Sequence, residues 1–183
     1  MSDENVRYFE AFPTWLRSLA DDARAMAEIL DDPRTPEASR RALAAGLNYL
    51  FKALDLIPDG IDDIGFLDDA FVLRVAAKQA LSYEGARAVD KGDALDRLGN
   101  EARMVEGFLG ADYPRLSAYV KSLWTSTVRG RSVEDLATKA EVRAALVSDV
   151  RAFAAGYTTP SFTREERTLV KLKSFLGAKL PPA

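Results

Sequence analysis

Apolar residues recur at intervals of three and four along almost the whole chain, and the alternation typical of strands is nearly absent. This spacing gathers apolar side chains on one helix face, because an α-helix turns once in about 3.6 residues. Short polar segments with proline or glycine separate the periodic stretches, such as DDPRTP at 31–36 and GADYP at 110–114. The pattern predicts an all-α protein, an orthogonal bundle of about seven helices.

Each predicted helix begins at a capping residue and ends at a helix breaker. Thr35 is expected to cap the second helix, Asp68 or Asp69 the third, and Asp93 the fourth. Capping boxes at Ser132 or Thr138, and at Thr163, open the last two helices. The predicted helices cover 13–30, 36–54, 68–88, 93–109, a stretch around 116–124 that ends before Gly130, a stretch from 132 or 138 to 155, and 163–177.

The composition is that of a soluble globular protein, with 48% hydrophobic and 29% charged residues. We expect a single all-helical domain over 1–183, with a helical hairpin at 36–89 and a C-terminal helical extension at 93–183. The start is acidic and unlike a signal peptide, and polar residues interrupt the longest apolar run, so we expect a cytoplasmic protein. A net charge of -3 and the absence of a basic stripe argue against nucleic acid as a partner.

The chain has no histidine and no cysteine. Their absence excludes Ser-His-Asp and Cys-His catalysis, imidazole metal centres, disulfides and zinc-thiolate sites. The chemistry left open uses carboxylates, lysine, tyrosine or serine, or a hard cation held by oxygen ligands. No cofactor motif is recognisable, so the only cofactor considered is a divalent cation.

An aspartate-rich connector separates the second and third predicted helices. It holds six aspartates in the span 55–69, interleaved with apolar residues. In one interpretation, Asp55, Asp59, Asp68 and Asp69 converge on Mg²⁺ or Mn²⁺ when the hairpin closes, and the cation activates a water against a phosphoester. The spacing does not match the calcium-loop pattern, and no phosphate-binding loop stands nearby.

The other interpretation makes the same aspartates structural. They bend and pin the corner by bonding main-chain amides and by capping the third helix, where the helix dipole favours negative charge. Arg74, Lys78 and Lys52 are expected to neutralise the remaining charge. We favour this structural role over the metal site.

The stretch 49–73, YLFKALDLIPDGIDDIGFLDDAFVL, resembles the signature of the YkvA-like bacterial family of unknown function. The matching residues are Tyr49, Leu50, Asp55, Leu56, Ile57, Pro58, Asp59, Ile61, Gly65, Phe66, Leu67, Asp68 and Asp69. The chain departs from the pattern at Lys52 and Ala53, where the family has Ser-Pro, at Gly60, where it has a large apolar residue, and at Asp62, where it has proline. The resemblance implies a helical hairpin and no known reaction.

These observations lead to one leading hypothesis and two alternatives. The leading one is a non-catalytic helical module that binds an unidentified protein partner, or a second copy of itself, and regulates it. The first alternative is a Mg²⁺- or Mn²⁺-dependent phosphoester hydrolase that uses the aspartate cluster. The second is a protein that associates with a membrane surface through the last helix, where Leu169, Leu172 and Leu176 lie opposite several lysines.

Overall fold

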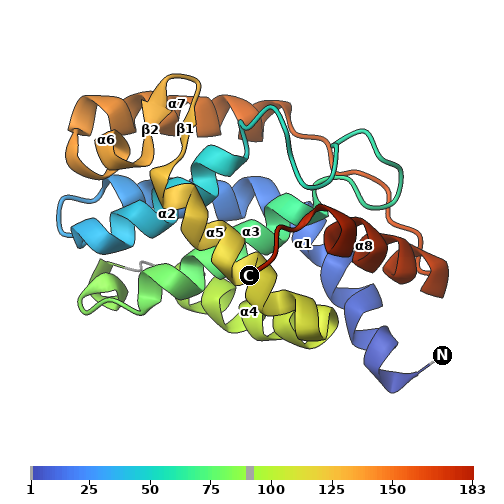
Figure 1. Cartoon of the computed structure of the whole chain (residues 1–183). Coiled ribbons are helices and arrows are strands. Elements are labelled where there is room, and N and C mark those ends of the chain that lie inside the picture. The colour runs from blue at the N-terminus through green and yellow to red at the C-terminus, as the bar shows by residue number, and fades with distance from the viewer. Residues whose placement is uncertain (1, 90–92) are drawn as a thin grey trace.

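The structure is a computed structural model that describes residues 2–89 and 93–183. These residues form an all-α bundle, as the sequence predicts (Figure 1). The helices are α1 (Asp3–Asp31), α2 (Glu37–Tyr49), α3 (Leu67–Leu81), α4 (Ala94–Leu109), α5 (Tyr113–Ser122), α6 (Val133–Thr138), α7 (Ala140–Gly156) and α8 (Glu166–Lys179). Short 3-10 turns lie at Ala86–Val89, Gly110–Asp112 and Leu123–Thr125, and strands β1 (Thr127–Val128) and β2 (Arg131–Ser132) form an antiparallel pair.

Helix α3 lies at the centre of the bundle, where α1, α2, α4 and α5 pack around it (Figure 1). Every residue from 67 to 77 is buried. A helix enclosed on all sides is expected to be apolar all round, because its backbone is satisfied internally and each face meets a neighbour. Three of these buried residues nevertheless carry ionisable groups, namely Asp68, Asp69 and Arg74. Their surroundings are therefore the first place to look for function.

Helix α1 begins ten residues before the predicted start at Pro13 and continues through this proline. Ser2 caps it, because its hydroxyl oxygen accepts a bond from the Asn5 amide at 3.4 Å. Proline interrupts a helix by removing one amide donor. Here the two turns before it bury Tyr8, Phe9 and Phe12 in the core, and this burial offsets the lost bond.

Several predicted boundaries are wrong, because tertiary packing and turn geometry decided them. Helix α2 ends at Tyr49 and α3 at Leu81, both earlier than predicted. The helix predicted to start at Ser132 or Thr138 is two helices, α6 and α7, separated at Lys139 by extended backbone. Ser132 caps α6 through the Asp135 amide at 3.0 Å, whereas the Thr138 hydroxyl donates to a carbonyl within α6.

The strand pair was not predicted, since each strand has only two residues. Arg129 and Gly130 connect the strands with φ of 50° and 74°. Positive φ at both turn residues matches the tight two-residue turn that joins twisted antiparallel strands. The turn places Arg129 beside Phe51, 4.7 Å from guanidinium carbon to ring centroid.

Candidate functional site

The connector, residues 50–66, folds back between α2 and α3 and is anchored in the core. Leu56, Ile57 and Ile64 are buried and hold it against the bundle. Only glycine fits at position 65, because a Cβ atom there would collide with the Asp59 carbonyl oxygen. Phe66 then adopts a left-handed conformation, with φ of 64°, immediately before α3. The connector is therefore closely packed rather than a loose loop.

Asp68 pins the connector to the start of α3. Its Oδ2 accepts a hydrogen bond from the Tyr49 hydroxyl at 2.5 Å and another from the Ile57 amide at 3.1 Å. The Tyr49 hydroxyl oxygen in turn accepts from the Leu56 amide at 2.7 Å. One buried carboxylate oxygen thus fixes both ends of the hairpin, in agreement with the expected bonding to main-chain amides.

The capping role predicted for Asp68 or Asp69 is wrong. Phe66 occupies the N-cap position of α3 without a side-chain cap, and both aspartates lie in the first helical turn. Helix α4 has Asp93 at its N-cap, as predicted, but this side chain makes no capping bond. Thr163 does not cap α8 either, because its hydroxyl donates to Asp63 Oδ1 at 2.6 Å.

Three buried carboxyl oxygens of the corner have no hydrogen-bond partner, and they belong to Asp55, Asp68 and Asp69. Burial is the main cause that raises the pKa of Asp55 to about 7, and the neighbouring charges of Asp68 and Asp59 add to it. Burial also raises the pKa of Asp68 to about 6, against the lowering effect of its bond with Tyr49. The pKa of Asp69 lies well above its usual value, because burial and the charge of Asp68 both oppose ionisation.

The cationic residues expected to neutralise this cluster mostly point elsewhere. Arg74 forms ion pairs with Asp22 and Glu101, on α1 and α4. Lys78 forms its ion pair with Glu106 of α4 at 3.6 Å. The expectation for Arg74 and Lys78 is therefore wrong, since both face α4 and not the connector.

Lys52 is a cationic side chain that acts on the corner. Its ammonium donates to the Leu54 carbonyl at 2.7 Å, and its charge lowers the pKa of Asp55. This effect is smaller than the burial of Asp55, whose pKa stays raised. We call Asp55, Asp59, Asp68 and Asp69 the carboxylate cluster. Nearby positive charge therefore compensates the negative charge of this cluster only weakly.

The structure does not arrange the carboxylate cluster as a finished metal centre. Across residues 2–89 and 93–183, no group of three or more acidic side chains is placed to hold a metal ion. Asp68 and Asp69 are 0% and 2% exposed, whereas Asp59 lies on the surface. A cation site at Asp55, Asp59, Asp68 and Asp69 stays a prediction.

A second buried charge network, which sequence reasoning missed, surrounds Arg74. Its guanidinium lies 2.8 Å from Glu101, 3.4 Å from Asp22 and 4.0 Å from the centroid of the Trp15 ring. Asp22 also accepts a 2.5 Å bond from Arg97. The network joins α1, α3 and α4. A charged residue among the otherwise apolar residues 70–77 was the available signal for it.

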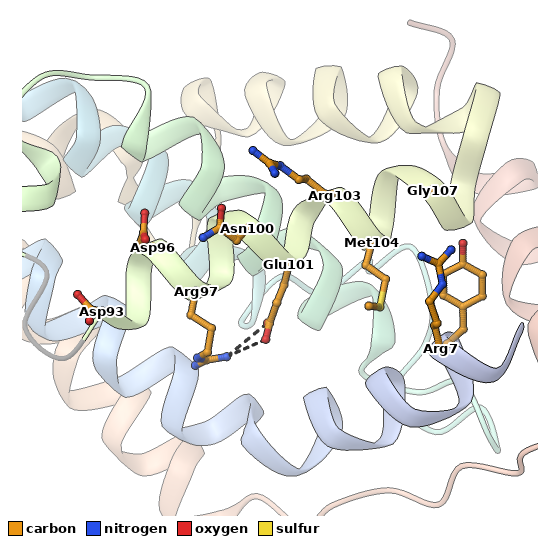
Figure 2. Close-up of a pocket in the computed structure, with 10 residues that line it drawn as sticks. Arg7, Asp93, Asp96, Arg97, Asn100, Glu101, Arg103, Met104 and Gly107 are labelled. Carbon is orange, nitrogen blue, oxygen red and sulfur yellow. Dashed lines mark hydrogen bonds and ion pairs between the residues drawn. The ribbon is translucent and has the colours of Figure 1, made fainter. Parts of the chain in front are cut away.

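A groove of about 840 Å³ lies between α1 and α4 (Figure 2). Half-buried Met104 supplies apolar surface, and Arg97 and Glu101 extend from α4 toward α1, joined by a 3.3 Å ion pair. None of the carboxylate cluster lines this groove, which is bordered by Arg7, Tyr8, Asp93, Asp96, Arg97, Asn100, Glu101, Arg103, Met104 and Gly107.

Three polar side chains of the groove form no ion pair with a described residue. In the described part of the chain, Arg103 and Asn100 make no side-chain hydrogen bond and no ion pair. Arg7 has no carboxylate partner there either, and its guanidinium carbon lies 6.0 Å from the centroid of the Tyr8 ring. The groove therefore presents the unpaired positive charges of Arg7 and Arg103, and its lining also includes the acidic side chains of Asp93, Asp96 and Glu101.

The leucine stripe of helix α8 packs against the rest of the protein. Leu169, Leu172 and Leu176 are 4%, 0% and 0% exposed, so their side chains cover the bundle. The Lys171 ammonium donates to the Asp62 carbonyl, and the Lys173 ammonium lies 4.9 Å from the centroid of the Phe108 ring. No helix in the ranges 2–89 and 93–183 is long and apolar enough to span a membrane.

Comparison with known proteins gives one match. A family model described as a protein of unknown function (DUF1232) matches residues 39–74, which is 36 of 183 residues and covers most of α2, the connector and the first half of α3. This confirms the expectation of an uncharacterised family signature confined to this segment. No curated protein and no solved structure matches the chain.

Proposed function

We propose that this protein is a non-catalytic helical module that binds a partner protein through the groove between α1 and α4. One observation carries the proposal: Arg7, Asn100 and Arg103 border the groove, which also contains Met104, and the fold leaves these three polar side chains without ion pairs. Charged and polar side chains without an ion pair in the fold can form one with another molecule. Arginine and methionine are also enriched at protein interfaces.

The chemistry of the groove favours an acidic segment that carries an apolar side chain. The unpaired guanidinium groups of Arg7 and Arg103 would meet carboxylates, which they can bind with two parallel hydrogen bonds. Met104 would contact an apolar side chain, and methionine adapts its shape to different occupants. Glu101 already pairs with Arg74 and Arg97, so it offers little repulsion to an incoming carboxylate.

The position of the carboxylate cluster supports a non-catalytic role. Its two carboxyls with the deepest burial, Asp68 and Asp69, belong to the central helix and line none of the groove. A phosphoester must reach its metal and its activated water directly. Hydrolysis therefore remains the alternative, and it requires that millimolar Mg²⁺ or Mn²⁺ raise the melting temperature.

The membrane alternative has less support. The leucines of α8 that were expected to enter a lipid surface are buried against the bundle. Val170 of the same helix is a large apolar residue that is exposed, at 63%. One apolar side chain supplies little of the buried area that interfacial helices need. Flotation with anionic vesicles at low salt tests this alternative.

The groove proposal is tested with a fluorescein-labelled peptide that presents glutamates and leucines at helical spacing. We expect anisotropy to report binding to the wild type, and at least about tenfold weaker binding to R7E and R103E. The matched control is R167E, on the exposed surface of α8 and outside the groove. A lysine-for-glutamate peptide should not bind. Equal affinity of the acidic peptide for all four proteins would refute the proposal.

A photoreactive residue placed at Asn100 identifies the natural partner. We expect a crosslinked protein in cells with the wild-type groove, and its loss when R7E and R103E are combined. A crosslink that survives this charge reversal contradicts the proposed recognition. A crosslink to a second copy of the chain would show that the groove mediates self-association and does not bind a different protein. Sedimentation velocity would also detect this self-association.

A further inference from the structure

We propose that the connector and the strand pair form a second binding surface, which takes an extended, acidic peptide segment of a partner protein. The surface is the edge hollow, lined by Phe51, Lys52, Ala53, Leu54, Thr127, Val128 and Arg129. The peptide adds to β1 as a third strand and places an apolar side chain in the hollow. The edge hollow shares no lining residue with the groove between α1 and α4, so this inference does not depend on the function proposed for that groove.

The first observation is that β1 has a free edge. Val128 pairs with Arg131 across the turn. At the next bonded position, the Val133 amide donates to the Ser126 carbonyl at 3.1 Å. Bonded and non-bonded pairs alternate along antiparallel strands, so Thr127, between these positions, directs its amide and carbonyl away from β2. Neither group has a hydrogen-bond partner in the described part of the chain.

The edge hollow lies along this free edge. Its volume is about 350 Å³, and its described lining comes from β1, the turn after it and the connector, with no residue of β2. Figure 1 shows β1 on the side of the strand pair that is nearer the connector. An unpaired strand edge is a template for another extended chain. Thr127 supplies only two main-chain bonds, so the side chains around the hollow must contribute to binding as well.

The second observation is an exposed leucine that the core does not use. Leu54 is 81% exposed, the largest fraction among the large hydrophobic residues that the structure describes. Phe51, which also lines the hollow, is half-buried. Burial of apolar surface stabilises a complex by about 25 cal/mol per Å². The hollow therefore favours an apolar side chain of the incoming strand.

The third observation is the positive charge beside the hollow. None of its described lining residues is acidic. Lys52 forms no ion pair with a described residue, and its ammonium donates to the Leu54 carbonyl. Arg129 is 57% exposed and lies 3.3 Å from Asp149, a carboxylate that Arg131 binds more closely at 2.7 Å. Both cations can therefore meet carboxylates of the peptide.

The same observations favour a peptide over a lipid surface. Anionic lipid would complement the positive charge, but it offers no strand to pair with the amide and carbonyl of Thr127. A hollow also accepts a side chain from outside, whereas insertion into a bilayer requires apolar surface that the protein itself buries in the lipid. The free edge and the hollow together thus point to an extended chain.

The test is a titration with labelled peptides, followed by anisotropy and by ¹⁵N NMR. The probes alternate threonine with valine, leucine or phenylalanine, and each carries a glutamate at both ends. We expect the wild type to bind, with shift changes at the amides of 52–54 and 126–130 and slower hydrogen exchange at the Thr127 amide. A probe that is N-methylated throughout cannot donate main-chain bonds and should not bind.

Two substitutions separate the contributions of the hollow. L54S removes the apolar contact, and R129N removes the charge while asparagine tolerates the φ of 50° at this turn position. Each should weaken binding by at least about fivefold, which corresponds to roughly 1 kcal/mol. The matched controls are V170S and R167N, at exposed positions of α8 outside the hollow, and both should bind as the wild type does.

The groove variants keep this proposal distinct from the proposed function. R7E and R103E should bind the extended probes with the affinity of the wild type, because neither residue lines the edge hollow. Loss of binding in both would assign the probes to the groove between α1 and α4 and overturn the edge hollow as their site.

Other outcomes would also overturn the proposal. One is that no probe binds the wild type at millimolar concentration, and another is that the N-methylated probe binds as well as its parent. Flotation of the wild type with phosphatidylglycerol vesicles, lost in L54S, would assign Leu54 to a lipid surface instead. A dimer in sedimentation velocity that L54S abolishes would assign the free edge to a second copy of the chain.

Discussion

Replacement of Arg74 by methionine tests whether the buried charge network stabilises the bundle. Arg74 is fully buried in the central helix and also donates to the Ala70 carbonyl at 3.0 Å. Methionine retains the length and apolar contacts of the arginine stem, including contact with Trp15, and removes the positive charge. The substitution therefore isolates the ion pairs that join α3 to α1 and α4.

The expected loss in the free energy of unfolding depends on the interactions that the partners of Arg74 retain in R74M. Removal of one member of a buried ion pair costs about 3–5 kcal/mol, because the other charge stays buried. Asp22, however, still accepts from Arg97 at 2.5 Å and from Ser18 at 2.8 Å. Glu101 is 26% exposed and also keeps Arg97. We therefore expect the lower end of the range, about 3 kcal/mol.

Urea denaturation followed by tryptophan fluorescence measures the free energy of unfolding of R74M. A loss of about 3 kcal/mol corresponds to a melting temperature lowered by roughly 6–12 °C for a chain of this size. The control is R24M on α1, where the arginine is 51% exposed and pairs with Asp21, so a change within about 0.5 kcal/mol is expected. A loss below about 1 kcal/mol in R74M would refute the reasoning.

Three other predictions concern local packing. Y49F removes the hydroxyl that links the connector to α3, and we expect a loss of about 1–3 kcal/mol in the free energy of unfolding, measured in urea. G65A should destabilise the protein, because its Cβ meets a main-chain carbonyl, whereas G60A has no atom within 4 Å and should melt within a degree or two of the wild type. L172A should cost about 2–5 kcal/mol in urea because this leucine is fully buried under α8, whereas V170A, at an exposed position, should change stability by less than about 0.5 kcal/mol.

The regular apolar spacing was sufficient to predict the fold class. An amphipathic helix must bury its apolar stripe, so a chain made of such stripes forms a helical bundle whatever its detailed packing. The helix starting near Asp93 was located within a residue or two, since periodicity and turn residues agree there. The start of α1 was missed, because the cost of Pro13 is a local signal, while the packing of Tyr8 and Phe12 is a tertiary effect.

The sequence also located the aspartate-rich connector and left two roles for it open. It could not determine which aspartates are buried, because their spacing does not reveal which neighbours enclose α3. The tertiary structure decided that Asp68 bonds the connector, that Asp69 lies buried with an unpaired oxygen, and that Arg74 turns away toward Asp22. The groove between α1 and α4 was equally invisible in the sequence, because its lining comes from residues about ninety positions apart. Local sequence thus determined where helices form, whereas the ionisation and exposure of side chains depend on which distant elements surround them.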